Sequence, residues 1–259
     1  MKQFLATAKQ AAEEAAVIIR HYYSAGAKVT IKQDRTPVTQ ADVESEEAIR
    51  AIIAKQFPDH GFYGEETGQS NIEADYVWLI DPIDGTKSFV RGYPFFSTQI
   101  ALMYKGEIIL GVSSAPPWNE LAWAVKGEGA WLNGEQINVS DINELRDAAV
   151  STGNIASLTR TAGWQILGDI LGEAGRTRGY GDFYHYHLLA SGKIDAVVES
   201  DVNILDIAAL SIIVEEAGGV FTQLDGNPIC LETRSVAAGN LAMHRLLLEK
   251  LSSTNLDSA

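Results

Sequence analysis

One short stretch constrains the fold of this chain more than any other, the segment 81–89 with the sequence DPIDGTKSF. It follows the apolar run 76–80 (YVWLI), which predicts a buried strand. The proline that comes next favours extended backbone at Asp81 and places that carboxylate at the end of the strand. Gly85 permits a tight turn and a close backbone approach. The sequence therefore predicts a strand that delivers Asp81 and Asp84 into a sharp turn.

The groups in this turn suit a metal-bridged phosphate. Hard divalent cations such as Mg²⁺ prefer oxygen ligands, and the turn offers carboxylates, a peptide carbonyl and a hydroxyl. Thr86 and Lys87 begin a short turn that we expect to be helical, and its free N–H groups can hold an anion. The alternative is an Asp-Gly turn with solvated acids, and the motifs described below favour the metal site instead.

Composition limits the class of protein. The 259 residues suffice for one large domain or two smaller ones, and no apolar run approaches the length of a membrane span. The first ten residues lack the apolar stretch of a signal peptide. Cys230 is the only cysteine, which excludes an internal disulfide and fits a reducing cytoplasm. We expect a cytoplasmic protein.

The net charge also limits the partners. A formal charge of −14 argues against binding to nucleic acid or to an anionic membrane. An acidic protein that binds a phosphate ester needs cations to invert the local field, and metal ions would supply them. A small phosphate ester with metal ions is therefore the partner that the charge and the turn together favour.

The first half of the chain predicts two helices against a sheet. Apolar residues recur at helical spacing over 4–23, and a second helix is expected over 41–57. In the second helix, Val43 is expected to face the core together with the isoleucines that follow it. Strands are predicted at 28–32, 97–104, 107–113 and 121–125. This half, residues 1–145, is predicted to be an α+β unit with a mostly antiparallel sheet that contains the turn 81–86.

Further acids precede the turn. Asp42 lies in the first turn of the second predicted helix, where the helix dipole favours a negative charge, so it has a plain structural interpretation. Glu65 and Glu66 lie between glycines in a predicted loop. Paired acids in loops are usually solvated, but their position just before the metal-like turn makes one of them a candidate ligand.

From about residue 147 the pattern changes to alternating strands and helices, which predicts an α/β half over 146–259. Strands are predicted at 148–151, 194–199, 220–222 and 236–238, and helices at 161–174, 183–191, 206–217 and 243–251. The tail 252–259 is polar and is expected to fray.

Three motifs in order, Gly64-Glu65-Glu66, the DPIDGT block at 81–86 and Asp206 at the start of a helix, resemble the inositol monophosphatase family of Mg²⁺-dependent phosphatases. The resemblance covers nearly the whole chain. It implies the layered αβαβα sandwich of the sugar-phosphatase superfamily, a homodimer and inhibition by lithium. One position departs from the family pattern, because Leu205 stands where a tryptophan usually precedes the last ligand.

The resemblance also implies a site. The metal ligands would be Glu65, Asp81, the carbonyl of Ile83, Asp84 and, from the second half, Asp206, and they would hold two or three Mg²⁺ ions. Thr86, which also belongs to the implied metal sites, would orient and activate water with Asp42, so that Asp42, Glu65, Asp84 and Thr86 form the catalytic set. Phosphoryl transfer needs positioning and charge stabilisation rather than a protein nucleophile. The backbone N–H groups of Gly85 and Thr86 would hold the phosphate, with Asp206 also touching substrate. Lys87 and Arg91 would add positive charge nearby or be exposed surface cations.

The block 179–192 (GYGDFYHYHLLASG) resembles the histidinol-phosphate phosphatases within this family, as does the KSF that follows DPIDGT. Asp182 stands where inositol phosphatases carry a small neutral residue, and Glu199 where the family contacts the leaving alcohol. Two carboxylates there suit a substrate that carries an ammonium and an imidazole. The alternative for Asp182 is an N-cap of the helix that follows. His185 and His187, two residues apart on a helix, make a poor zinc site and are expected to be packing or surface residues.

Together these features predict a Mg²⁺-dependent phosphomonoesterase that hydrolyses histidinol phosphate in histidine biosynthesis. The nearest alternative is an inositol-1-phosphate phosphatase or a broader phosphatase of small esters. A more remote one is a non-catalytic acidic protein that binds cations, against which the complete ligand set argues.

Overall fold

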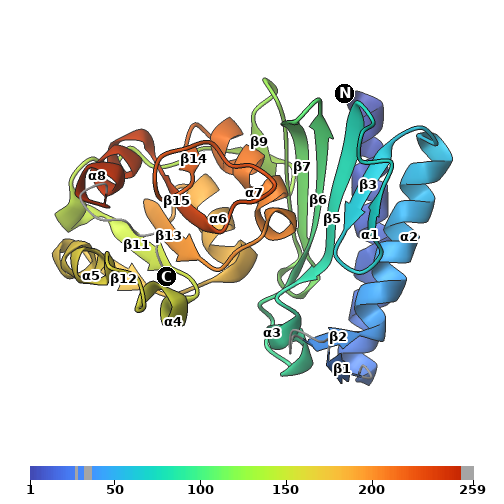
Figure 1. Ribbon diagram of the computed structural model, residues 1–259, viewed down its shortest axis with the longest axis horizontal. Helices are drawn as coiled ribbons and strands as arrows, with labels where there is room; N and C mark the ends of the chain where they lie inside the picture. The colour runs from blue at the N-terminus through green and yellow to red at the C-terminus, as the bar shows by residue number, and fades with distance from the viewer. Residues whose placement is uncertain (27–28, 32–36, 252–259) are drawn as a thin grey trace. The chain divides into compact units, whose positions relative to one another are not determined.

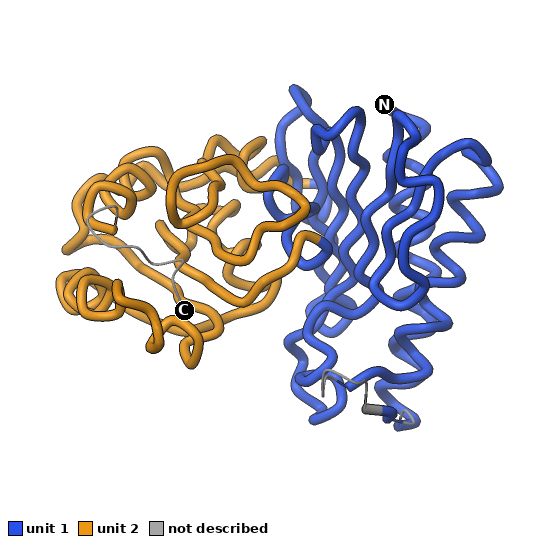
Figure 2. Tube along the Cα trace, viewed as in Figure 1, with its two compact units in different colours: residues 1–134, 205–213 blue, residues 135–204, 214–259 orange. Residues whose placement is uncertain are grey.

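The computed structural model describes residues 1–26, 29–31 and 37–251. The predicted tail 252–259 and the ends of the predicted strand 28–32 lie outside these ranges. The chain forms two compact units, residues 1–134 with 205–213 and residues 135–204 with 214–259 (Figure 2). The sequence placed the division at 145/146 and Asp206 in the second half. In the structure the segment that carries Asp206 belongs to the first unit.

The first unit is built on a sheet. Among its described residues, seven strands pair in the order β9-β8-β7-β6-β5-β3-β4. The β3–β5 pair is parallel and the others are antiparallel. These strands are β3 (Gly61–Gly64), β4 (Gly68–Ser70), β5 (Tyr76–Asp84), β6 (Ser97–Tyr104), β7 (Glu107–Ala115), β8 (Glu120–Val125) and β9 (Ala130–Leu132). A separate ribbon pairs β1 (Val29–Ile31) with β2 (Pro37–Thr39).

Helices α1 (Lys2–Ala25) and α2 (Gln40–Gln56) cover one face of this sheet (Figure 1). Helix α1 buries a row of alanines, which allows a close approach to buried side chains such as Trp78 and Leu110. The expectation that Val43 faces the core was wrong, because it is 37% exposed. The first half of the buried face of α2 contains the polar side chains of Asp42, Ser45 and Glu46 after Ala41, and the second half contains Ile49 and Ile53. Hydrogen bonds, described below, compensate the burial of the two acids on this face.

The opposite face of the sheet receives part of α7 (Ile204–Glu216). Leu110 and Val112 of β7 belong to the core beneath α1, so Gly111 between them points to the other face. A Cβ atom on Gly111 would lie 2.4 Å from the carbonyl oxygen of Ala209, so the glycine permits α7 to approach. The apolar side chains of α7 are buried around its whole circumference, as expected of a core helix.

The second unit contains a mixed sheet. In its described part, strands β12 (Arg176–Arg178), β11 (Ala149–Thr152), β13 (Ala196–Ser200), β15 (Ser235–Gly239) and β14 (Val220–Thr222) pair in that order. The first three are parallel and the last three antiparallel. The shorter elements are β10 (Glu135–Ile137), the 3₁₀ turn Leu145–Asp147 and α4 (Ile155–Leu158).

Helices lie on both faces of the second sheet. Leu167 of α5 (Trp164–Glu173) and Leu247 of α8 (Leu241–Leu251) pack in one core with Val150 and Val198. The residues that follow these valines, Ser151 and Glu199, point to the other face and contact α6 (Asp182–Ala190). Each unit is thus a sheet with helices on both faces. None of the helices in the described ranges is long and apolar enough to cross a membrane.

Candidate active site

The strand β5 brings its two aspartates together through an irregularity in the ladder. Asp81 pairs with Gln99 and Asp84 with Ser97, so three steps along β5 match two along β6. Residues three apart on a regular strand point to opposite faces, and the extra residue of this bulge cancels that alternation. The bulge thus brings Asp81 and Asp84 to one side of the strand, and carboxylate oxygens of these two residues and of Asp206 lie within 4.8 Å of one another.

Local hydrogen bonds shape the turn that follows. The backbone N–H of Ile83 donates to the Asp81 carboxylate at 2.9 Å, and the hydroxyl of Thr98 donates to the Pro82 carbonyl at 2.8 Å. Gly85 has a φ of 88°, and a Cβ atom there would lie 2.5 Å from the Phe95 carbonyl oxygen. Only glycine satisfies both conditions, as the sequence predicted. The five-residue helix α3 (Thr86–Val90) begins directly after it, and Lys87 and Arg91 are exposed.

Asp206 comes to the cluster from the first turn of α7, where the helix dipole favours a negative charge. Its neighbour Leu205 is 5% exposed and packs in the interior. The position that departs from the family pattern is therefore filled by an apolar packing residue, and the carboxylate beside it still reaches the cluster.

The electrostatics of the cluster call for a cation. Burial raises the pKa of Asp81 well above its usual range, and the negative charges of Glu65, Asp84 and Asp206 raise it further. Asp81 and Asp84 are 2% and 8% exposed, so water screens their repulsion poorly. A divalent cation with oxygen ligands would neutralise this repulsion, and the donor set therefore fits the metal that the sequence predicted.

Asp42 lies next to the cluster, and both of its carboxylate oxygens accept hydrogen bonds. One oxygen accepts hydrogen bonds from the N–H and hydroxyl of Thr39, at 2.8 and 2.6 Å. The other accepts from the hydroxyl of Thr86 at 3.2 Å, and the same hydroxyl lies 3.0 Å from the Ile83 carbonyl oxygen. Burial raises the pKa of Asp42, and the hydrogen bonds from Thr39 oppose that shift. The predicted pair of Thr86 and Asp42 is thus in contact.

The turn that contains Glu65 is stabilised by Glu46, a residue that the sequence analysis missed. The backbone N–H of Glu65, in the turn after β3, donates to the Ile80 carbonyl at 3.2 Å. The buried carboxylate of Glu46 on α2 accepts hydrogen bonds from the backbone N–H groups of Glu66 and Thr67, at 2.7 and 3.1 Å, and from the Thr67 hydroxyl.

The turn is built around that carboxylate. A Cβ atom on Gly64 would lie 1.9 Å from a Glu46 carboxylate oxygen, so the glycine makes room for it. The sequence pattern could have revealed Glu46, because it lies four residues after Asp42 and three before Ile49, on the buried face of the helix.

Two of the predicted substrate residues, Asp182 and Glu199, belong to the second unit. Gly181, not Asp182, is the N-cap of α6, which corrects the capping interpretation, and Asp182 is the first helical residue, with a φ of 47°. Glu199 on β13 is 4% exposed and accepts hydrogen bonds from Tyr186 and His185. His185 and His187 are 0% and 1% exposed, so neither is a surface residue.

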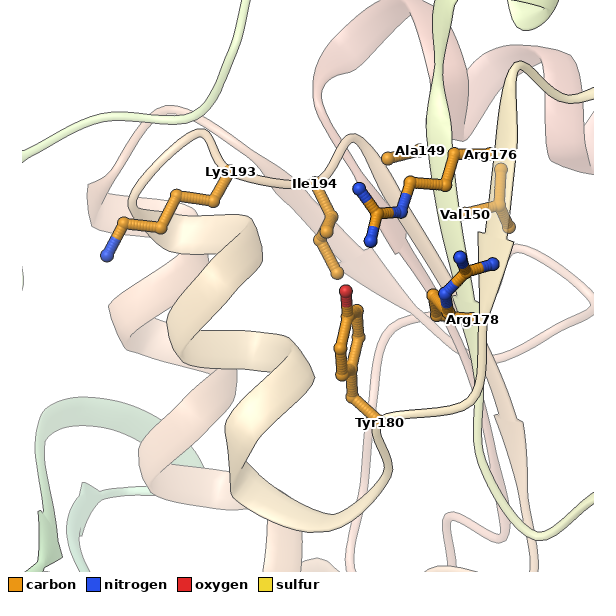
Figure 3. Close-up of a pocket in the computed structure, with 7 residues that line it drawn as sticks. All are labelled: Ala149, Val150, Arg176, Arg178, Tyr180, Lys193 and Ile194. Atoms are coloured by element: carbon orange, nitrogen blue, oxygen red, sulfur yellow. The ribbon is translucent and has the colours of Figure 1, made fainter. Parts of the chain in front are cut away.

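A small hollow at the edge of the second sheet is lined by several basic side chains (Figure 3). The guanidinium of Arg176 and the hydroxyl of Tyr180 point into it, whereas Lys193 extends away from both. Its lining also includes Arg178, and within the described residues that lining contains no carboxylate. The hollow can attract an anion, but its described lining has no carboxylate to hold a divalent cation, so the carboxylate cluster is the candidate active site.

A carboxylate cluster at a strand-to-helix turn can hold a divalent cation and is suited to metal-assisted chemistry on a phosphate ester. The chain belongs to the inositol monophosphatase family, whose family model matches residues 1–256. A structure of inositol monophosphatase from Anabaena (Nostoc) has a TM-score of 0.86 to this chain at 30% identity, over 98% of this chain and 97% of the other. The predicted fold class is therefore confirmed.

The curated relatives carry more than one substrate in their names. A histidinol-phosphatase of Streptomyces coelicolor is 38% identical over 85% of this chain and 86% of its own length. A fructose-1,6-bisphosphatase/inositol-1-monophosphatase of Aquifex aeolicus is 34% identical over 96% of this chain and 95% of its own length. The protein is thus a phosphatase of this family, and these names alone do not select its substrate.

Proposed function

We propose that the protein is a Mg²⁺-dependent phosphomonoesterase that hydrolyses histidinol phosphate to histidinol and phosphate. The observation that carries the hydrolytic part is the approach of the Asp81, Asp84 and Asp206 oxygens to within 4.8 Å. With Glu65 and the Ile83 carbonyl, these residues would hold the ions. When bound, the Mg²⁺ ions would stabilise charge on the phosphate and lower the pKa of water.

The protein residues would then position the reactants. The Thr86 hydroxyl can donate its proton to Asp42 or to the Ile83 carbonyl, and in either case its oxygen lone pairs are available to accept a hydrogen bond from the attacking water. The water oxygen forms a bond to phosphorus while the bond from phosphorus to the alcohol oxygen breaks, and a proton ends on the departing alcohol. We keep the predicted roles of the Gly85 and Thr86 N–H groups in holding the phosphate, and of Asp206 in touching the substrate.

The choice of histidinol phosphate rests on the second unit. Glu199 is a buried carboxylate, and Asp182 opens the helix packed against its strand. Negative groups at the substrate side favour a leaving alcohol that carries an ammonium, whereas a neutral polyol gains less from them. The similarity to named histidinol-phosphatases supports this choice. The predicted homodimer, cytoplasmic location and lithium sensitivity remain part of the proposal.

Inositol-1-phosphate is the second candidate, because relatives at 32–33% identity are named inositol-1-monophosphatases. The test is kcat/KM with Mg²⁺ on histidinol phosphate and inositol-1-phosphate side by side. We expect a preference of about a hundredfold for histidinol phosphate, roughly 2.7 kcal/mol. The reverse preference would overturn the substrate assignment and keep the metal mechanism. In the same assay Asp182→Ala should impair histidinol phosphate far more than a neutral ester, and equal losses would make Asp182 structural.

A further inference from the structure

The carboxylate of Glu199 is bonded on one side only. Its Oε2 atom accepts from the hydroxyl of Tyr186 at 2.7 Å and lies 3.0 Å from Nε2 of His185. Among the described residues, no group donates a hydrogen bond to the other oxygen, Oε1. Glu199 is 4% exposed, and this oxygen, which lacks a protein donor, suits a donor that arrives with a ligand.

The hydrogen bonds behind Glu199 assign a role to each group. A carboxylate only accepts, so His185 carries its proton on Nε2 and donates it to Glu199. The Nδ1 atom lies 3.2 Å from the hydroxyl of Ser151, which fixes the orientation of the ring. The Ser151 oxygen in turn accepts from the backbone N–H of Tyr180 at 3.2 Å. Since His185 is 0% exposed, no solvent can replace these partners.

The backbone beside Oε1 of Glu199 leaves no room for a side chain. A Cβ atom on Gly153 would lie 1.8 Å from Oε1, so any side chain at this position would displace the carboxylate. Gly153 follows β11, and its N–H donates to the Val198 carbonyl at 3.2 Å, which holds it beside β13. Glu199 is therefore held by side chains at Oε2 and bounded by bare backbone at Oε1.

We propose that His185, together with Tyr186, is a positioning residue that sets substrate specificity. By holding Oε2, the two side chains present Oε1 of Glu199 to an N–H or O–H donor on the leaving alcohol, such as the ammonium of an amino alcohol. The inference rests on the proposed function for the identity of that alcohol. The hydrogen-bond roles of His185 do not depend on it.

The kinetic test compares histidinol phosphate with p-nitrophenyl phosphate, whose leaving group has no donor for Oε1. We expect His185→Leu to raise KM for histidinol phosphate about tenfold while kcat/KM for p-nitrophenyl phosphate changes less than about twofold. His185→Gln keeps an N–H donor on the side chain and should restore most of the loss. In a Glu199→Gln background, His185→Leu should have little further effect, because both changes act on one carboxylate.

His187→Leu is the matched control. It removes a buried imidazole from the same helix, and this imidazole makes no hydrogen bond to Glu199. Equal losses on both substrates, additive effects of His185→Leu and Glu199→Gln, or the same loss from His187→Leu would overturn the proposal. Thermal unfolding of each variant identifies any that fail to fold, and His185→Gln and Tyr186→Phe then carry the test.

A spectroscopic test separates this inference from the proposed function. In ¹⁵N-histidine-labelled wild-type protein, His185 should carry a proton on Nε2, and its signals should shift in Glu199→Gln and Ser151→Ala. A proton on Nδ1 instead would overturn the positioning role. If that signature is found but the wild-type enzyme does not favour histidinol phosphate, the substrate assignment fails and the positioning role stands.

Discussion

Asp81→Asn should make the metal-free protein more stable while it removes the response to Mg²⁺. The substitution deletes one charge from a cluster whose ligand oxygens lie within 4.8 Å of one another. At an effective dielectric constant of about 20, two unit charges at that separation repel by about 3.5 kcal/mol. The asparagine retains an oxygen that can accept the Ile83 N–H, so the turn keeps its internal hydrogen bond.

Burial and the neighbouring negative charges raise the pKa of Asp81. We therefore expect Asp81→Asn to stabilise the metal-free protein by about 2 kcal/mol at pH 8, or roughly 4–8 °C in Tm. The folded carboxyl binds its proton more tightly than the unfolded one. Its contribution to stability is thus fully present below the unfolded pKa and is lost as pH rises through the folded pKa. The gain from Asp81→Asn should accordingly be largest at high pH and vanish near about pH 4.

The assay is thermal unfolding in EDTA and in Mg²⁺. At a hundred times its Kd, Mg²⁺ should stabilise the wild type by about 2.7 kcal/mol, and it should stabilise Asp81→Asn much less. Asp169→Asn makes the same chemical change on the exposed face of α5 and should alter neither quantity. If Asp81→Asn were less stable than the wild type in EDTA at pH 8, and still gained the full stabilisation from Mg²⁺, the electrostatic argument would be refuted.

Three further predictions concern the neighbours of the cluster. Glu46→Gln should raise the Mg²⁺ concentration for half-maximal activity about tenfold, with kcat recovered at saturation, because the amide accepts poorly from the N–H groups of residues 66 and 67. A Mg²⁺ titration followed by activity and by Tm measures this, and an unchanged Mg²⁺ midpoint would contradict it. Thr86→Ala should lower kcat by about a hundredfold or more through loss of the water-orienting hydroxyl, and Thr86→Ser should recover much of the lost kcat. Equal rates for the two variants would exclude a role for the hydroxyl. Gly85→Ala should destabilise the protein by about 2 kcal/mol or more, because the φ of 88° is unfavourable for alanine and its Cβ atom would lie 2.5 Å from the Phe95 carbonyl oxygen. Urea unfolding measures this, and an unchanged urea midpoint would mean that the turn relaxes freely.

Local sequence rules predicted the strand and turn at 76–86 because its chemistry lies within a few residues. An apolar run, a proline and a glycine each act on their immediate neighbours. The same rules do not predict that a bulge between β5 and β6 brings Asp81 and Asp84 to one side, because the bulge depends on the pairing with the partner strand. Nor do they predict that Asp206 joins the first unit, since that contact spans more than a hundred residues.

The errors in the sequence analysis come from polar groups that are buried and paired. The rule that apolar residues face inward predicted a buried Val43, but α2 turns Asp42 and Glu46 inward and exposes the valine. The histidines of α6 were expected to be packing or surface residues, and both are buried, but the spacing did not reveal that His185 contacts Glu199. Such residues are stabilised by partners distant in sequence, which a hydrophobic pattern does not reveal.

The central claim is that phosphate-ester hydrolysis depends on divalent cations held by the carboxylate cluster. The most direct measurement is the initial rate of phosphate release from histidinol phosphate by the wild type and by Asp206→Asn, each with Mg²⁺ and with EDTA. We predict release by the wild type with Mg²⁺, none above background in EDTA, and a rate for Asp206→Asn lower by about a hundredfold or more. Release that persists in EDTA, or that Asp206→Asn leaves at the wild-type rate, would contradict the claim.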